Sequence, residues 1–195
     1  MGQGIGDLVR TGLRHPREGA RRFLSLPFDE RHTGELVAAA ILLGSVTEYL
    51  FALVLVTVSR SSGQPPGQIE RMLEAVLAGG PITLAIAGTL AFGLRWGLVM
   101  LAGRLFSGRG GPGEAARLLA WYDILWTLLF LAILLVVVVL PPIGVLLLLF
   151  AGFWSVWMMV EFVSALHGWE NRMAVFFGLM TGYLFLQILL GLLPI

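Results

Sequence analysis

Residues 118–165, LLAWYDILWTLLFLAILLVVVVLPPIGVLLLLFAGFWSVWMMVEFVSA, decide the fold of this chain. As one helix this stretch would be about 70 Å long, whereas about 20 apolar residues suffice to cross a hydrocarbon core of about 30 Å. Pro141 and Pro142 interrupt it, and proline cannot donate the backbone hydrogen bond that a continuing helix needs. The sequence therefore predicts two membrane-spanning helices, 118–140 and 143–165, joined as a hairpin.

Three further apolar stretches are long enough to span a membrane. They cover about 36–58, 81–103 and 173–193. The chain is 57% hydrophobic and only 13% charged, with a mean hydropathy of +0.87, so its charged side chains are too few to cover a water-soluble fold. We expect an all-α polytopic membrane bundle of five transmembrane helices, with a cytosolic N-terminal segment (1–35) and a transmembrane domain (36–195).

The arginines are unevenly distributed between the two predicted sides of the membrane. Residues 1–35, 104–117 and 166–172 hold ten of the 13 basic residues, whereas the opposite side holds only Arg60 and Arg71. Since basic loops stay in the cytoplasm, this asymmetry places the N-terminus in the cytoplasm and the C-terminus outside. Residues 1–35 contain no apolar core or cleavage site of a signal peptide.

The N-terminal segment contains a predicted helix that starts at Pro16. Arg17, Arg21 and Arg22 lie beside the apolar Phe23, a pattern typical of an interfacial helix that contacts anionic lipid headgroups. The alternative is a solvated lead-in to the first span. A second short amphipathic helix is expected at 67–78, before the second span.

Four ionisable residues lie inside the predicted spans. They are Glu48, Arg95, Asp123 and Glu161. A central charge costs about 2.5–3.5 kcal/mol on insertion scales, so such groups usually face the bundle interior or belong to a pathway. At 1.5 Å per residue, Arg95 lies at a depth between the acids, within reach of Glu48 or Asp123.

Asp123 and Glu161 fall at nearly equal depth, with His167 less than two turns beyond Glu161. If the two acids shared a site, both could not easily be ionised, and the site would respond to protons or cations. The alternative interpretation is structural: each acid pairs with a nearby arginine, with Tyr122 or with a helix hydroxyl. In that case the pairs fix helix register and do no chemistry.

Two glycine pairs could mark helix packing seams. They are Gly93 with Gly97 and Gly178 with Gly182. Small residues four apart let two membrane helices approach closely, although such pairs are common in membrane helices generally.

Motifs of catalysis are missing from the sequence. There is no cysteine, the three histidines are scattered, and no nucleophile-elbow, phosphate-loop or dinucleotide motif occurs. We therefore expect no enzyme activity, no cofactor and no metal site. A net charge of +1 provides no broad basic surface, which argues against nucleic acid as a partner.

Four local patterns together resemble the Yip1-domain family of small multi-spanning membrane proteins. They are His15-Pro16-Arg17-Glu18 before Phe23; Gly110-Gly111-Pro112-Gly113-Glu114 followed by Leu119-Ala120-Trp121-Tyr122; Leu140-Pro141-Pro142-Ile143-Gly144; and Phe153-Trp154 through Leu166-His167-Gly168 to Arg172-Met173-Ala174. The resemblance implies a five-span fold with a cytosolic N-terminus, in agreement with the arginine distribution.

The resemblance also bears on partners and location. Eukaryotic members are associated with vesicle traffic and prenylated small GTPases, whereas bacterial members have no settled function. This chain has a short N-terminal segment and lacks a proline near Ile124 and Leu125, so a small GTPase is not expected as its partner. The use of Arg without Lys is typical of a GC-rich bacterial genome, which suggests the bacterial inner membrane.

Two functions remain open from the sequence. One is a non-enzymatic membrane protein that organises or accompanies membrane protein complexes or lipids, with other membrane proteins or a second copy as partners. The other is a small transporter or channel-like protein that moves protons, ions or a polar solute past the intramembrane charges. Hydropathy does not discriminate between them.

Overall fold

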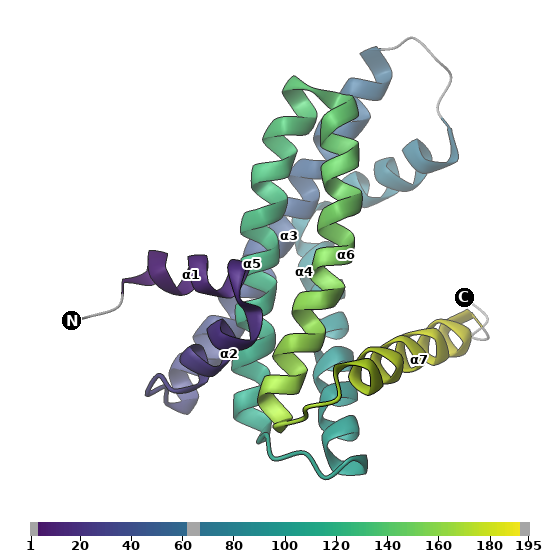
Figure 1. Cartoon of the computed structure of the whole chain (residues 1–195). Helices are drawn as coiled ribbons and strands as arrows, with labels where there is room; N and C mark the ends of the chain where they lie inside the picture. Colours follow the sequence, from purple (N-terminus) through teal and green to yellow (C-terminus); the bar gives the residue numbers. More distant parts are fainter. Residues whose placement is uncertain (1–3, 62–66, 192–195) are drawn as a thin grey trace.

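The computed structural model describes residues 4–61 and 67–191, and all the regular structure in these ranges is helical (Figure 1). The helices are α1 (Ile5–Arg14), α2 (Pro16–Leu24), α3 (Glu30–Ser61), α4 (Gln68–Leu105), α5 (Pro112–Val139), α6 (Pro141–His167) and α7 (Arg172–Gly191). Four helical stretches are long and apolar enough to cross a membrane: Glu30–Thr57, Arg71–Leu105, Pro112–Val139 and Pro142–His167. The predicted polytopic helical bundle is confirmed.

Helices α5 and α6 form the predicted hairpin and lie side by side along the bundle (Figure 1). Leu140 separates them: its amide donates to the carbonyl of Val136, while its own carbonyl accepts from the amide of Gly144 at 2.9 Å. A Cβ atom on Gly144 would lie only 2.5 Å from the Cα of Val137. Glycine at this position therefore allows the two helices to approach closely just after the turn.

Helix α4 consists of two arms that meet at Gly80. This glycine has φ 70° and ψ 175°, outside the helical region, and Pro81 follows it. Glycine adopts a positive φ without steric cost, and proline is well placed at the start of a helix. The arm before Gly80 confirms the expected short helix at 67–78, and the arm after it supplies the second span.

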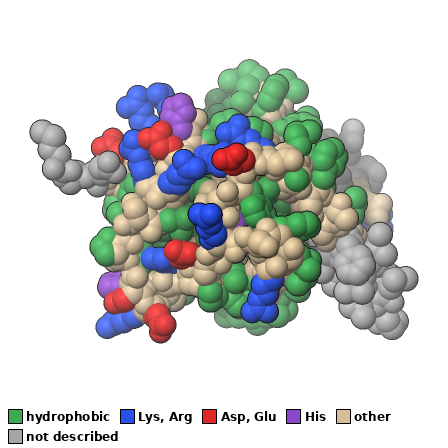
Figure 2. Space-filling view, turned by 60° about the horizontal axis from the view of Figure 1, so that its bottom comes forward, with side chains coloured by type: hydrophobic (Ala, Val, Ile, Leu, Met, Phe, Trp, Pro, Cys, Tyr) green, Lys and Arg blue, Asp and Glu red, His purple; other side chains and the backbone are tan. Residues whose placement is uncertain are grey.

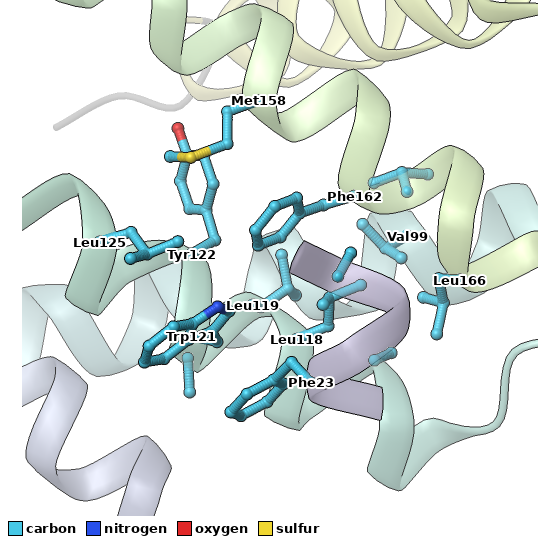
Figure 3. Close-up of a cluster of buried hydrophobic side chains, with 14 of the residues drawn as sticks. Phe23, Val99, Leu118, Leu119, Trp121, Tyr122, Leu125, Met158, Phe162 and Leu166 are labelled. Carbon is cyan, nitrogen blue, oxygen red and sulfur yellow. The ribbon is translucent and has the colours of Figure 1, made fainter. Parts of the chain in front are cut away.

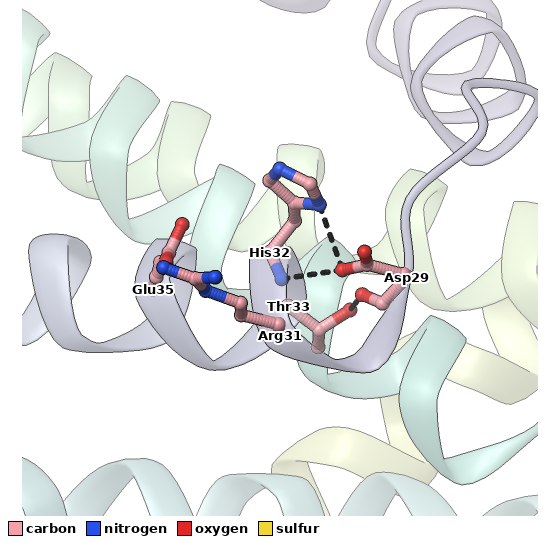
Figure 4. Close-up of polar contacts among 5 residues, drawn as sticks. All are labelled: Asp29, Arg31, His32, Thr33 and Glu35. Carbon is pink, nitrogen blue, oxygen red and sulfur yellow. Dashed lines mark hydrogen bonds and ion pairs between the residues drawn. The ribbon is translucent and has the colours of Figure 1, made fainter.

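Helix α3 begins directly after Asp29, whose carboxylate accepts a hydrogen bond from the backbone amide of His32 at 2.7 Å. The hydroxyl of Thr33 donates to the Asp29 carbonyl at 2.9 Å, and Arg31 pairs with Glu35 at 3.0 Å (Figure 4). The bond from His32 satisfies a backbone amide that has no partner within the first turn of a helix, and the other two contacts add side-chain bonds to this turn. The first span thus starts at a polar, exposed cap.

The N-terminal helices α1 and α2 pack against α5 and α6 near the lower end of the bundle (Figure 1). Ala20 and Phe23 of α2 are buried, and the Phe23 ring stacks on Trp121 at 4.9 Å with an interplanar angle of 5° (Figure 3). Gly12 and Gly19 allow α1 and α2 to cross closely. Much of the N-terminal segment therefore shares the main core, while its separation from the spans at residue 35 stays a prediction.

Helix α7 has a different relation to the bundle. It packs mainly against α6, leaves the lower end of the bundle and points away from it (Figure 1). Its apolar stretch over the described side chains, Arg172–Gly182, is shorter than a membrane span. The predicted span 173–193 extends beyond the described residues, so the fifth crossing and the side of the C-terminus stay predictions.

Candidate functional site

Arg95 of α4 and Asp123 of α5 form a bidentate ion pair between neighbouring helices. The two guanidinium nitrogens Nη1 and Nη2 donate to Oδ1 and Oδ2 of Asp123 at 2.7 and 2.8 Å. The Asp123 side chain is 15% exposed and that of Arg95 is 38% exposed. A planar guanidinium matched to a carboxylate gives both charge compensation and a fixed geometry. The pairing expected from their depths is confirmed.

Glu48 lies on α3, close enough to Arg95 and Asp123 to interact with both charges electrostatically. It forms no direct ion pair with Arg95, and its residue is exposed on the surface of the bundle. Its neighbours Ser45, Thr47 and Ala52 are buried on this part of α3. The structure thus brings together two acids and one arginine, of which only Asp123 binds the arginine directly.

Glu161 of α6 is paired with a residue that the sequence did not suggest. Its side chain is 4% exposed, and its Oε1 accepts from Nε of Arg172 at 3.0 Å. The Arg172 guanidinium also lies over the Trp157 ring, 5.7 Å from its centroid. Asp123 and Glu161 therefore have separate arginine partners, and the structure shows no ion pair or hydrogen bond that would join them in one site.

His167 at the end of α6 is almost completely buried, with 2% of its surface exposed. Its Nε2 lies 3.2 Å from the Val99 carbonyl, and its ring lies against Trp169 with centroids 4.6 Å apart. Any side-chain carbon at Gly103 or Gly108 would collide with this ring. His167 therefore holds the ends of α4 and α6 together, which is a packing role.

Among the described residues, three buried polar atoms on α6 have no hydrogen-bond partner. They are Oε2 of Glu161, Oγ of Ser164 and Nδ1 of His167, on residues spaced three apart. Ser164 is fully buried, and because it carries no charge, a pattern of intramembrane charges does not reveal it. Buried polar atoms of this kind are usually satisfied by water.

The arginines predicted to contact lipid headgroups differ in their surroundings. Nη2 of Arg17 donates to the carbonyl of Trp169 at 2.9 Å, which ties α2 to the segment between α6 and α7. Arg22 pairs with Glu18 one turn away. Arg21 is exposed and forms no ion pair within the described part of the chain. Headgroup contact stays a prediction for all three, and Arg17 has in addition a structural role.

Arg172 is the functional residue that sequence reasoning missed. It begins α7 and was assigned to a loop, while Glu161 lies on α6 almost two turns before the helix ends. A long arginine side chain spans such a difference in depth. One feature of the sequence could have indicated the pair: Arg172 follows closely after the span that contains Glu161, and neither residue had a specific expected partner.

No group of three or more His, Asp or Glu able to hold a metal ion occurs within residues 4–61 and 67–191. The arrangement consists instead of two interhelical ion pairs, one further carboxylate and a buried histidine. Such groups can position helices, and a carboxylate near an ion pair can also exchange protons.

Comparison with known proteins identifies one family, and the match covers nearly the whole chain. The Yip1 domain matches residues 12–192, from the end of α1 to the end of α7. No curated protein and no solved structure matches the chain. The protein is therefore a multi-pass membrane protein that belongs to the Yip1 domain family.

Proposed function

We propose that this protein is a non-enzymatic membrane protein that organises or accompanies membrane protein complexes and lipids. The observation that carries the proposal is the ion pair between Arg95 and Asp123, whose two short contacts use the donors and acceptors of both groups. Glu161 and Arg172 form a second interhelical pair. Charges that neutralise one another between helices serve to fix their relative position.

The surface of the bundle supports the same function. Large apolar side chains are exposed along the spans, including Leu90, Leu135, Phe150 and Phe153. In a membrane these faces contact lipid or the helices of other proteins. We expect other membrane proteins or a second copy as partners, and no small GTPase.

The proposed topology is five crossings in the bacterial inner membrane, with the N-terminus in the cytoplasm. The loop between α4 and α5, the segment between α6 and α7 and helix α2 lie at one end of the bundle (Figure 1), as this topology requires. Fusions of a cytoplasmic and an external reporter to each terminus test it. Two termini on the same side would contradict five crossings.

Co-purification in mild detergent tests the organising function. The tagged protein is isolated from its own membranes, and captured proteins and lipids are compared with those of an Asp123→Asn variant. We expect the wild type to capture defined partners and the variant to capture smaller amounts of them, because the helices that form the binding faces shift in the variant. A protein that always isolates alone, with a deletion strain whose membrane complexes and lipids are unchanged, would refute the proposal.

Transport is the rival function, and Glu48 is the observation in its favour. The residue lies on the exposed surface of the bundle, and its charge interacts with the Arg95–Asp123 pair without binding the arginine directly. Flux of protons, alkali cations and small polar solutes is measured in proteoliposomes with Glu48→Gln, Asp123→Asn and Glu161→Gln. Flux that these variants abolish, and that Glu35→Gln at the exposed start of α3 leaves intact, would establish transport and displace the organising function.

A further inference from the structure

An apolar groove of about 510 Å³ lies where α7 diverges from the bundle, between α7 and the last turns of α4. Its walls come from α4, α6 and α7, and they include Leu98, Leu101, Val163, Ala174, Gly178 and Gly182. Figure 1 shows that α7 leaves the lower end of the bundle at an angle. The groove is separate from the Arg95–Asp123 pair, since neither residue lines it.

The α7 wall of the groove is lined by small residues, and the space beside them is open. Gly178 and Gly182 lie four residues apart on this wall, with Ala174 one turn before them. A Cβ atom at either glycine would meet no other atom within 4 Å. The groove therefore has room for a slender apolar chain along α7.

The end of the groove nearest the loops carries free charges. Glu170 lines it, and the Cδ of Arg109 lies 4.0 Å from where a Cβ would stand on Gly168, another lining residue. In the described part of the chain, neither Glu170 nor Arg109 forms an ion pair.

This charged end coincides with the polar end of the bundle. Figure 2, which brings the lower end of the molecule forward, shows basic and acidic side chains together over this face, with hydrophobic side chains around it. Trp169 also lies at this end, with its Nε1 donating to the Phe106 carbonyl at 3.3 Å. Tryptophan is typical of the membrane–water interface, so an apolar chain in the groove would end at headgroup level.

We propose that the groove binds one acyl chain of a glycerophospholipid with an ammonium-bearing headgroup, such as phosphatidylethanolamine. The phosphate binds Arg109, and the ammonium group binds Glu170. A phospholipid of this kind supplies an apolar chain for the groove, and an anion and a cation for the two charged residues at its end. A helix of a second copy would fill the groove but would leave these two charges unpaired.

This site rests on the proposed function in one respect: it names one phospholipid among the lipids with which the protein associates. Native mass spectrometry of the full chain in mild detergent, after addition of phosphatidylethanolamine or phosphatidylglycerol, measures the site directly. We expect one bound phosphatidylethanolamine per chain. Phosphatidylglycerol, which carries no ammonium group, should bind more weakly.

The variant Gly178→Leu fills the groove, and Gly97→Leu is its matched control. A Cβ at Gly97 likewise meets nothing within 4 Å, but Gly97 does not line the groove. We expect Gly178→Leu to lose the bound phospholipid and Gly97→Leu to retain it, with both variants eluting as monodisperse species. Equal retention in the two variants would overturn the site.

Charge variants test the headgroup. Glu170→Gln should weaken phosphatidylethanolamine binding about tenfold and abolish the preference over phosphatidylglycerol, because one charge-assisted hydrogen bond is lost. Arg109→Gln should weaken both lipids. Equal affinity of the wild type for both lipids, or a change of oligomeric state in Gly178→Leu without loss of lipid, would refute the proposal. Protein partners that co-purify unchanged with Gly178→Leu would leave the organising function intact, so the two proposals fail separately.

Discussion

The two ends of the bundle are built in opposite ways. At the loop end, α2 lies against α5 and α6, and the side chains of Phe23, Leu118 and Phe162 are buried there (Figure 3). At the hairpin end, where α5 turns into α6, Leu135 and Val139 are 71% and 74% exposed. The composition of the hairpin end is no less apolar, so hydrophobicity alone does not decide which residues are buried.

The difference follows from the solvent at each end. Apolar side chains lose nothing by facing lipid, so packing in the membrane depends on close contacts and on polar groups that need partners. The loop end contains the charged and polar groups, among them Arg17, Asp123 and His167, and helices close over these residues. The hairpin end contains almost none and is held by the close approach at Gly144 and by a small buried cluster of Ile133, Val137 and Ala151.

Phe23→Ala is expected to have the largest effect. The ring is 3% exposed and stacks on Trp121, so its removal should lower the free energy of unfolding by about 3–5 kcal/mol and detach α2. Unfolding by a denaturing detergent in mixed micelles measures the change. Phe150→Ala, on the hairpin half of α6, is the control and should stay near the wild type, because this ring is 72% exposed. Equal losses in the two variants would break the contrast between the ends.

Asp123→Asn should come next, at about 3 kcal/mol, because Arg95 would keep its charge in a partly buried position without a partner. Adding Arg95→Gln to this variant should recover much of the loss. The same unfolding assay gives the interaction energy from the four combinations. For comparison, Glu35→Gln removes the exposed pair with Arg31 and should cost less than about 1 kcal/mol. A double variant as unstable as Asp123→Asn would contradict a dominant role for the pair.

Gly144→Ala tests the hairpin end itself. The new methyl group would collide with the backbone of Val137, at an expected cost of about 1–3 kcal/mol, reduced by about 1 kcal/mol because alanine favours the helix. Gly152→Ala on the same helix has open space and should stabilise the protein slightly. Thermal unfolding in detergent compares the two variants. Stabilisation of both would show that the helices are not in close contact after the turn.

The smallest expected effect is the pH dependence of the cap on α3. The hydrogen bond from the His32 backbone holds the pKa of Asp29 below its ordinary value of 3.8. Because the folded-state pKa is depressed, the stabilisation is present above this ordinary value and is lost as the pH falls through the folded-state pKa. NMR titration of the Asp29 carboxyl measures the shift, and Asp29→Asn should keep the first turn of α3 without this pH dependence. An ordinary pKa for the Asp29 carboxyl would show that the hydrogen bond from the His32 amide is not formed.

The sequence predicted the fold well where local chemistry is decisive. The hairpin at Pro141, the four long spans and the separate short helix before Gly80 follow from hydropathy and from proline and glycine, and all of them are present. Depth counted along the helices placed Arg95 within reach of Glu48 or Asp123, and the structure shows that Asp123 is its partner. It did not predict Arg172 as the partner of Glu161, because a residue just outside a span was counted as part of a loop.

The placement of the N-terminal helices was beyond reach of the sequence. An amphipathic helix with arginines beside Phe23 has the same pattern whether it lies on lipid or on other helices. Only the structure shows that Phe23 stacks on Trp121 and that Arg17 binds the Trp169 carbonyl. These contacts join residues more than 95 positions apart, and no local pattern encodes such partners.

By itself the sequence determined that the chain is helical, where its four long apolar spans lie, and that lipid surrounds them. These properties depend on residues near one another and on the cost of moving them out of water. Only the tertiary structure decided which acid binds which arginine, that His167 is enclosed by Gly103 and Gly108, and that α7 leaves a groove beside α4. Such choices depend on how distant helices fit against each other, because similar apolar faces can pack in several ways and only close contacts and polar partners select one.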